Sequence, residues 1–153
     1  MSAVIIAEAG VNHNGSAELA FKLVEAAHDA GADIIKFQTF KAKSIVTSQA
    51  LQADYQVANT GKRETQLSML SRLELSHDLH FELLEYCKTL GIEFLSTAFD
   101  SESLNFLVHE LGLKRLKIPS GEITNAPLLL EHAATGCELV MSTGMATLGE
   151  IEA

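Results

Sequence analysis

Short apolar runs along the chain alternate with longer segments in which apolar residues recur every three or four positions. The runs predict buried strands, and the longer segments predict amphipathic helices. The expected strands cover residues 3–7, 33–38, 93–97, 115–118 and 138–142. The expected helices cover residues 17–30, 77–90, 101–111 and 126–134, and one more begins at Leu148. Strands and helices in this alternation indicate βαβ units and a parallel sheet.

Glycines end several of the predicted helices at regular intervals. Gly31, Gly91, Gly112 and Gly136 each precede a predicted strand, and glycine suits the left-handed conformation that ends a helix. The last three are 21 and then 24 residues apart. This cadence is typical of a (β/α)₈ TIM barrel, although a doubly wound sheet could also show it. Because such a barrel needs about 250 residues, we expect residues 1–153 to be the N-terminal portion of a barrel domain, with about five βα units.

Residues 39–76 interrupt this cadence with a long polar connection after the second predicted strand. Connections of this length are usually functional or partly helical. Leu67, Leu70 and Leu73 predict one short helix within it. Ser16 and Ser76 stand where they can cap the helices that follow them.

The charge balance limits the partners of the chain. A net charge of −9 argues against a nucleic acid or an anionic membrane surface. No run approaches the roughly 18 apolar residues of a membrane span, and no signal peptide is evident. Cys87 and Cys137 fit no metal-binding spacing, so we expect buried free thiols. A cytoplasmic location is expected from these features together.

Lys36 and Lys117 each lie inside a predicted buried strand. A lysine covered on both sides of a sheet would lose its hydration at high cost. At the carboxyl end of a parallel strand, where α/β folds bind ligands, it can instead face a wet anion-binding site. Two such lysines predict a site for a phosphate and a carboxylate.

Polar side chains follow the other predicted strands at the same edge. Hydroxyls there can donate hydrogen bonds to anionic oxygens, and carboxylates can bind hydroxyls or act as acid–base groups. The candidates are Glu8, Lys36, Gln38, Thr97, Lys117, Ser120, Glu122 and Ser142.

Simpler roles remain open for several of these residues. Glu8 could be only a salt-bridge partner of Lys36, Lys117 could mark an exposed strand end, and Ser142 could belong to a turn. The histidines of the predicted helices are expected on solvated faces. They are His77, His80, His109 and His132.

Five segments together resemble the N-acetylneuraminate (sialic acid) synthase family, in the order that the family shows. The segments are IAEAGVNHNG at 6–15, IKFQT at 35–39, FLSTAFD at 94–100, LKIPSGEITN at 116–125 and MSTGM at 141–145. The resemblance implies a TIM barrel that condenses phosphoenolpyruvate with an N-acyl amino sugar, N-acetylmannosamine or a relative, and forms a nonulosonic acid and phosphate.

The same resemblance implies roles for the candidate residues. Lys36 and Lys117 would anchor phosphoenolpyruvate, and Gln38 would contact the bound substrates. The carboxylates Glu8 and Glu122 would face the amino sugar and the reacting carbons. The hydroxyls that would join the two lysines at phosphoenolpyruvate are those of Thr97, Ser120 and Ser142.

The resemblance also implies parts that the chain is not expected to contain. In the family a divalent metal, Mn²⁺ or Mg²⁺, orients the sugar aldehyde, and its two histidine ligands belong to later strands. The C-terminal half-barrel and the small antifreeze-like domain, which reaches into the site of a partner in a homodimer, would also follow Ala153. We therefore expect no metal ligand here, and we expect the isolated chain to be inactive.

Two other readings stay open at this point. A Schiff-base aldolase would use Lys36 or Lys117 to form an imine with pyruvate. A non-catalytic reading treats the chain as an open half-barrel that serves as an assembly or binding module.

Overall fold

The computed structural model describes residues 3–47, 49–50 and 64–153. Within them the strands form one parallel sheet, in which each strand is hydrogen-bonded to its neighbours in sequence. A doubly wound sheet would reverse this order at its switch point, so the doubly wound alternative is wrong, and five consecutive βα units of a (β/α)₈ barrel account for the topology. The strands are β1 Ile6–Gly10, β2 Ile34–Thr39, β3 Glu93–Ala98, β4 Arg115–Ile118 and β5 Glu138–Met141.

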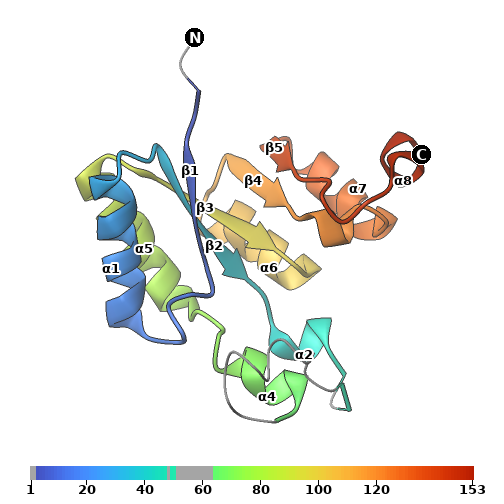
Figure 1. Ribbon diagram of the computed structural model, residues 1–153, viewed down its shortest axis with the longest axis horizontal. Helices are drawn as coiled ribbons and strands as arrows, with labels where there is room; N and C mark the ends of the chain where they lie inside the picture. Colours follow the sequence, from blue (N-terminus) through green and yellow to red (C-terminus); the bar gives the residue numbers. More distant parts are fainter. Residues whose placement is uncertain (1–2, 48, 51–63) are drawn as a thin grey trace.

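Helices connect the strands and pack on one face of the sheet (Figure 1). Helices α1 and α5 lie side by side, while α2 and α4 lie together beyond the end of β2. The α-helices are α1 Ala17–Asp29, α2 Ala42–Ile45, α4 Gln66–Ser71, α5 His77–Leu90, α6 Ser101–Asn105, α7 Ala126–Ala134 and α8 Leu148–Glu152. A π-helix, η1 Phe106–Glu110, continues α6, and a 3₁₀ turn, η2 Ser120–Glu122, follows β4.

The core lies between the sheet and these helices. Phe37 of β2 stacks on Phe94 of β3, with ring centroids 5.6 Å apart. Leu83 of α5 and Leu107 of η1 are fully buried against this layer. Because side chains alternate along a strand, the residues between these core positions face the opposite side of the sheet.

The predicted elements agree closely with the structure, and β4, α5 and α7 have the predicted bounds. The first strand differs, because Ile6 is the first residue that the β1–β2 register pairs, opposite Ile34. Val4 and Ile5 lie outside the sheet and are 60% and 55% exposed. Apolar character alone therefore placed this strand three residues too early.

The helix predicted at 101–111 contains a change of helical type. The Leu111 amide donates to the Phe106 carbonyl, five residues earlier, which is the bond that defines a π-helix. The predicted caps are confirmed, since the Ser16 and Ser76 side chains accept from backbone amides of α1 and α5. Gly91 ends α5 with φ +73°, as the glycine pattern predicted.

In the long connection, α4 confirms the short helix that was predicted from its leucines. Residues 48 and 51–63 of that connection lie outside the described residues. Both cysteines are free thiols. Cys87 is buried, and burial raises the pKa of its thiol to about 12. Cys137 is half-buried and donates to the Leu113 carbonyl.

Candidate functional site

The strand register places five of the predicted site residues on the face of the sheet opposite the helices. Glu8 lies opposite Lys36, and Thr97 lies opposite both Gln38 and Lys117. Residues that pair in register, or that stand two apart on one strand, point to the same face. These five side chains therefore share one face near the carboxyl ends of β1 to β4, where parallel α/β folds bind ligands.

Lys36 is nearly buried, with 7% of the residue exposed. Its Nζ lies 2.6 Å from Glu8 Oε2 and donates to Thr97 Oγ1 at 3.3 Å. The ion pair compensates the desolvation of the ammonium group. The Glu8 side chain is 56% exposed, so its carboxylate also remains open to solvent. The salt bridge that the simpler role of Glu8 required is present, and the carboxylate is still accessible to a ligand.

Lys117 is half-buried and donates to two neutral oxygens. Its Nζ lies 2.6 Å from the Ile118 carbonyl and 2.6 Å from Ser142 Oγ. Burial lowers the pKa of Lys117, and the charge of Lys36 lowers it further, while Glu8 raises it. Thr97 accepts from Lys36 and lies opposite Lys117 in the β3–β4 register. The two lysines therefore lie on one face of the sheet, on either side of Thr97, and Lys117 is half-buried rather than an exposed strand end.

Gln38 reaches the same region beside Gly10. A Cβ atom built at Gly10 would lie 3.2 Å from Glu8 Oε1 and 3.5 Å from Gln38 Nε2. Gly10 also has φ +52°, a backbone conformation that residues other than glycine rarely adopt. The absence of a side chain at this position leaves room for both polar groups.

Ser120 and Glu122 lie in η2, directly after β4. Glu122 accepts a hydrogen bond from Asn125 Nδ2 at 2.7 Å, and Asn125 is the N-cap residue of α7. The hydrogen bonds among the described residues do not join Ser120 or Glu122 to either lysine, so their site roles stay predictions. Asp100, at the end of β3, caps α6 instead by accepting from the Ser103 amide and hydroxyl.

The histidines correct the sequence analysis. His109 is exposed as predicted, but His80 and His132 are buried, at 0% and 1% exposure. Each forms a 2.8 Å hydrogen bond between its Nδ1 and a carbonyl four residues earlier. The signal was available, because His80 precedes Leu83 and Cys87 by three and seven residues, on the apolar side of α5.

Two further histidines lie close to His80. His77 is half-buried and stacks on Phe106, with ring centroids 3.7 Å apart. His13 is fully buried, its Nδ1 accepts from the Gly15 amide at 3.0 Å, and burial lowers its pKa. His13 lies between Asn12 and Asn14, in a composition typical of turns, which gave no sign of this burial.

Among the described residues, no three His, Cys, Asp or Glu side chains lie together as a metal ion would require. Glu8 is paired with Lys36, and Glu122 with Asn125. These residues thus do not fit a divalent metal by themselves. Within the same residues, every helix is too short or too polar to cross a membrane.

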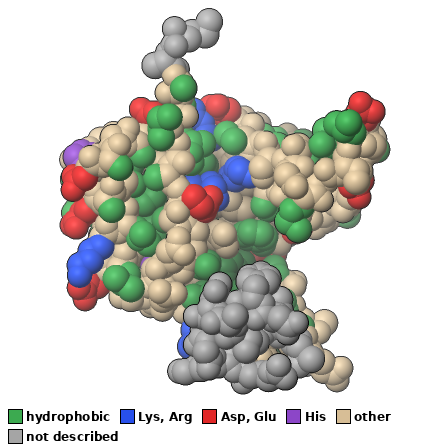
Figure 2. All heavy atoms as spheres, in the orientation of Figure 1, with side chains coloured by type: hydrophobic (Ala, Val, Ile, Leu, Met, Phe, Trp, Pro, Cys, Tyr) green, Lys and Arg blue, Asp and Glu red, His purple; other side chains and the backbone are tan. Residues whose placement is uncertain are grey.

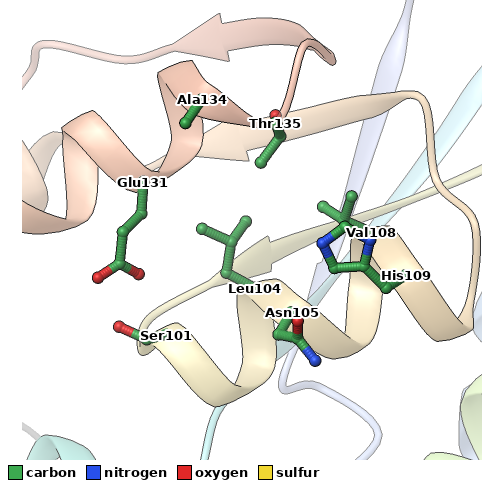
Figure 3. A pocket seen from close by; sticks show the side chains of 8 residues that line it. All are labelled: Ser101, Leu104, Asn105, Val108, His109, Glu131, Ala134 and Thr135. Carbon is green, nitrogen blue, oxygen red and sulfur yellow. The ribbon is translucent and has the colours of Figure 1, made fainter.

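The surface shows where charge gathers. In Figure 2, Lys or Arg atoms lie beside Asp or Glu atoms in the centre of the visible face, among apolar and neutral atoms. A separate hollow of about 400 Å³ lies between α6, η1 and α7. There Glu131 of α7 points toward Ser101 of α6 (Figure 3). None of the eight predicted site residues lines that hollow; the candidate site is located by the charged side chains at the carboxyl ends of β1 to β4.

Comparison with known proteins adds named relatives. The chain is 54% identical over 149 residues to N,N'-diacetyllegionaminic acid synthase of Campylobacter jejuni, which covers 97% of this chain and 44% of that protein. It is 53% identical to the protein of the same name from Legionella pneumophila, over 99% of this chain and 42% of that protein. The chain therefore spans less than half the length of these curated relatives.

A solved structure agrees. An N-acetylneuraminic acid synthetase from Leptospira borgpetersenii, solved in complex with citrate, superposes with a TM-score of 0.82 at 31% identity. The match covers 98% of this chain and 48% of that one, and it confirms the predicted fold class. The model of the NeuB family matches residues 23–153, which is most of the sequence. The chain belongs to the NeuB family.

Proposed function

We propose that this chain contributes the phosphoenolpyruvate site of a synthase that condenses phosphoenolpyruvate with an N-acyl amino sugar. The observation that carries the proposal is the placement of Lys36 on β2 and Lys117 on β4, on one face of the sheet and on either side of Thr97 of β3. The relatives named as sialic acid and legionaminic acid synthases support it.

The charges of the site suit a small dianionic ligand. Two ammonium groups face one carboxylate, Glu8, which is already paired with Lys36. Lys117 is held only by neutral oxygens in its hydrogen bonds. A phosphate or carboxylate placed between the two lysines would relieve their mutual repulsion and form charge-assisted hydrogen bonds. Thr97, Ser120 and Ser142 would add hydroxyl donors.

The proposed reaction joins two carbons and expels phosphate. C3 of the enol attacks the sugar aldehyde carbon, whose oxygen takes up a proton and becomes a hydroxyl. Water then adds at C2 and loses one proton, which leaves a hydroxyl there. Cleavage of the bond between C2 and the phosphate oxygen, with transfer of the hydroxyl proton to phosphate, releases phosphate and leaves a ketone. Held near both lysines, the phosphate would leave as a stabilised anion.

Glu8, Glu122 and Gln38 are proposed to face the acceptor sugar. The exposed carboxylate of Glu8 can bind a sugar hydroxyl or exchange a proton with it. Gln38 can donate and accept in the same region. N-acetylmannosamine is one possible acceptor, and the names of the most similar relatives support a doubly N-acetylated amino sugar.

The divalent metal and the homodimer expected from the resemblance remain part of the proposal, as does a cytoplasmic location. In a full-length enzyme, Mn²⁺ or Mg²⁺ would activate the aldehyde as an electrophile. The described residues supply no donor set for it, so its ligands would come from outside them. No residue role proposed above depends on the metal.

Calorimetric titration of phosphoenolpyruvate into the 153-residue chain tests the proposal. We expect saturable binding that inorganic phosphate competes away. No binding at millimolar ligand would overturn the assignment of this site. A turnover assay with Mn²⁺, phosphoenolpyruvate and N-acetylmannosamine, repeated with a doubly N-acetylated amino sugar, should release no phosphate from this chain alone. Phosphate release would contradict the expectation that the chain is inactive by itself.

The lowered pKa of Lys117 also favours a second candidate. A desolvated lysine near another cation is the kind of amine that forms imines. A Schiff-base aldolase would then use Lys117 as its nucleophile. Borohydride treatment in the presence of pyruvate separates the two candidates. A covalent adduct on Lys117 would support the aldolase, and the absence of an adduct would support phosphate binding.

A non-catalytic assembly module remains the third reading from the sequence. Sizing chromatography combined with a thermal shift in phosphoenolpyruvate addresses it. A multimer whose melting temperature does not respond to the ligand would support the module over either enzyme.

A further inference from the structure

Two buried hydroxyls lie on the helix-facing side of the sheet, directly behind the candidate site. Thr39 and Ser96 are 4% and 0% exposed. Along their strands they are the immediate neighbours of Gln38 and Thr97, which lie opposite each other in the β2–β3 register. Because side chains alternate along a strand, Thr39 and Ser96 point away from the site while Gln38 and Thr97 point into it.

A histidine ties both hydroxyls to helix α5. His80 Nδ1 lies 2.8 Å from the Ser76 carbonyl, and its Nε2 lies 2.8 Å from Thr39 Oγ1. Thr39 Oγ1 in turn lies 2.7 Å from Ser96 Oγ. Since a carbonyl can only accept, Nδ1 carries a proton; in the neutral imidazole Nε2 then accepts from Thr39, whose oxygen accepts from Ser96. This chain of bonds runs from the first turn of α5 to the ends of β2 and β3.

Several groups around His80 bear on its charge. Burial lowers the pKa of His80 to about 4, while the bond to the Ser76 carbonyl opposes this shift. His77 on α5, Lys41 after β2 and His13 in the β1–α1 loop lower the pKa further. The imidazole is therefore neutral near pH 7, and in this state Nε2 can accept from Thr39.

Comparison with His132 shows that the bond from His80 to the sheet does not follow from burial of a histidine on a helix. His132 on α7 is equally buried and makes the same 2.8 Å bond to a carbonyl four residues earlier, that of Leu128. Its Nε2, however, has no hydrogen-bond partner among the described residues. Only at His80 does the second nitrogen continue into the sheet.

We propose that His80 is a positioning residue for the candidate site. By holding Thr39 and Ser96, it fixes the ends of β2 and β3 and thereby the places of Gln38 and Thr97 beside Lys36. The proposal rests on the proposed function, because the site that it positions is the phosphoenolpyruvate site. Lys36 reaches Thr97 across 3.3 Å, so a displacement of either strand end by about 1 Å would break that contact.

The test compares substitutions along the network with a matched control. Thr39→Val removes the central hydroxyl at nearly constant volume, Thr39→Ser keeps it, and His80→Leu removes the histidine. His132→Leu is the control, since it deletes a buried histidine outside the network. Circular dichroism first selects a temperature at which every variant is folded. Calorimetric titration with phosphoenolpyruvate then gives the affinities.

We expect Thr39→Val and His80→Leu to weaken phosphoenolpyruvate binding about tenfold or more, because small displacements of binding groups have large effects. Thr39→Ser should bind within about twofold of the parent chain, by the same argument. His132→Leu should lower the melting temperature without changing the affinity. Parental affinity in both Thr39→Val and His80→Leu would overturn the proposal, and so would an equal loss in His132→Leu.

A second measurement separates this proposal from the proposed function. The order parameter of the Thr97 methyl group is measured by NMR relaxation without any ligand. It should fall in His80→Leu and Thr39→Val, and it should keep its parental value in His132→Leu. An unchanged order parameter in the network variants overturns the positioning role even if phosphoenolpyruvate binds. Failure of the parent chain to bind phosphoenolpyruvate, with the order parameter falling as expected, overturns the proposed function alone.

Discussion

The two ends of the same sheet face carry charge in opposite ways. At the amino ends of the strands, Arg115 lies 2.6 Å from Glu93 and 3.0 Å from Glu138, so one cation meets two carboxylates. At the carboxyl ends, Glu8 pairs with Lys36, whereas the described partners of Lys117 are neutral oxygens and burial lowers its pKa. A cation whose charge is neutralised by neighbouring carboxylates needs no ligand. A site with more cations than carboxylates attracts an anionic ligand.

The turns at the two ends also differ in packing. Gly15, in the loop after β1, has φ +77°, and a Cβ atom there would collide with the Arg72 backbone carbonyl. Gly136, before β5, has φ +70° and nothing within 4 Å of a built Cβ. At Gly15 the carboxyl end is thus closely packed against the segment after α4, while at Gly136 the amino end has room. The same backbone conformation serves contact at one end and a simple turn at the other.

Gly15→Ala should give the largest effect of the predictions that follow. The left-handed φ alone costs about 1 kcal/mol, and the collision with Arg72 should bring the loss of unfolding free energy to about 4 kcal/mol. Gly136→Ala is the matched control and should lose only about 1 kcal/mol. Urea unfolding measures both. Equal losses would contradict the asymmetry of the two ends.

His80 makes the packed end sensitive to acid. The pKa of His80 is about 4 in the folded chain, below the ordinary value of 6.5. Between these two pH values the unfolded chain binds more protons than the folded chain, so the free energy of unfolding decreases as the pH is lowered. Full stability is present above pH 6.5, and roughly 3 kcal/mol is lost by pH 4. The lowered pKa of His13 acts with the same sign.

Urea unfolding of the parent chain and of His80→Leu, each at pH 7 and pH 4, measures this contribution. The variant should lose less stability than the parent chain over the interval, because it lacks the group whose protonation opposes folding. Equal losses in the two proteins would show that His80 does not supply the sensitivity.

Lys117→Met tests the excess of cations directly. Removing one ammonium group should weaken phosphoenolpyruvate binding on the order of 50-fold. This loss of affinity corresponds to the free energy that a hydrogen bond to a charged group usually contributes. Arg115→Met removes a cation from the compensated end and should leave the affinity within about twofold. Calorimetry gives both values. A comparable loss in Arg115→Met would show that the two ends do not differ in the way proposed.

The smallest effect is expected from the compensated cluster itself. Glu138 is 63% exposed in its side chain, and exposed ion pairs contribute about 0.2–1 kcal/mol. Glu138→Gln should therefore lower the unfolding free energy by about 0.5 kcal/mol, and added salt should shrink the difference. A loss of several kcal/mol in urea unfolding would mean that this end is far more rigid than its exposure indicates.

Local patterns were sufficient for most of the fold. Apolar periodicity, serine caps and terminal glycines placed α5 and β4 with correct bounds, because these signals act within a few residues. The start of β1 depends on its pairing with β2, a segment distant in sequence, and was therefore inaccessible to local patterns.

The candidate site divides in the same way. Lys36 and Lys117 could be found because a charge inside an apolar strand is unusual, and alternation along the strand sets their common face. Asp100 and Asn125 each cap a helix through an amide three residues away, which is a local signal of the same kind as the serine caps. For His80, helical periodicity places the ring on the apolar side of α5, but its bond to Thr39, 41 residues away, depends on the tertiary structure.

The sequential order of the strands bears on how this protein is made. Each strand is hydrogen-bonded only to its neighbours in sequence within the described sheet. A chain emerging from the ribosome can therefore dock each βα unit onto the one already formed, without waiting for a distant segment. Lys36 and Lys117 are 81 residues apart in the sequence. The candidate site would therefore be completed only after β4 has joined the sheet.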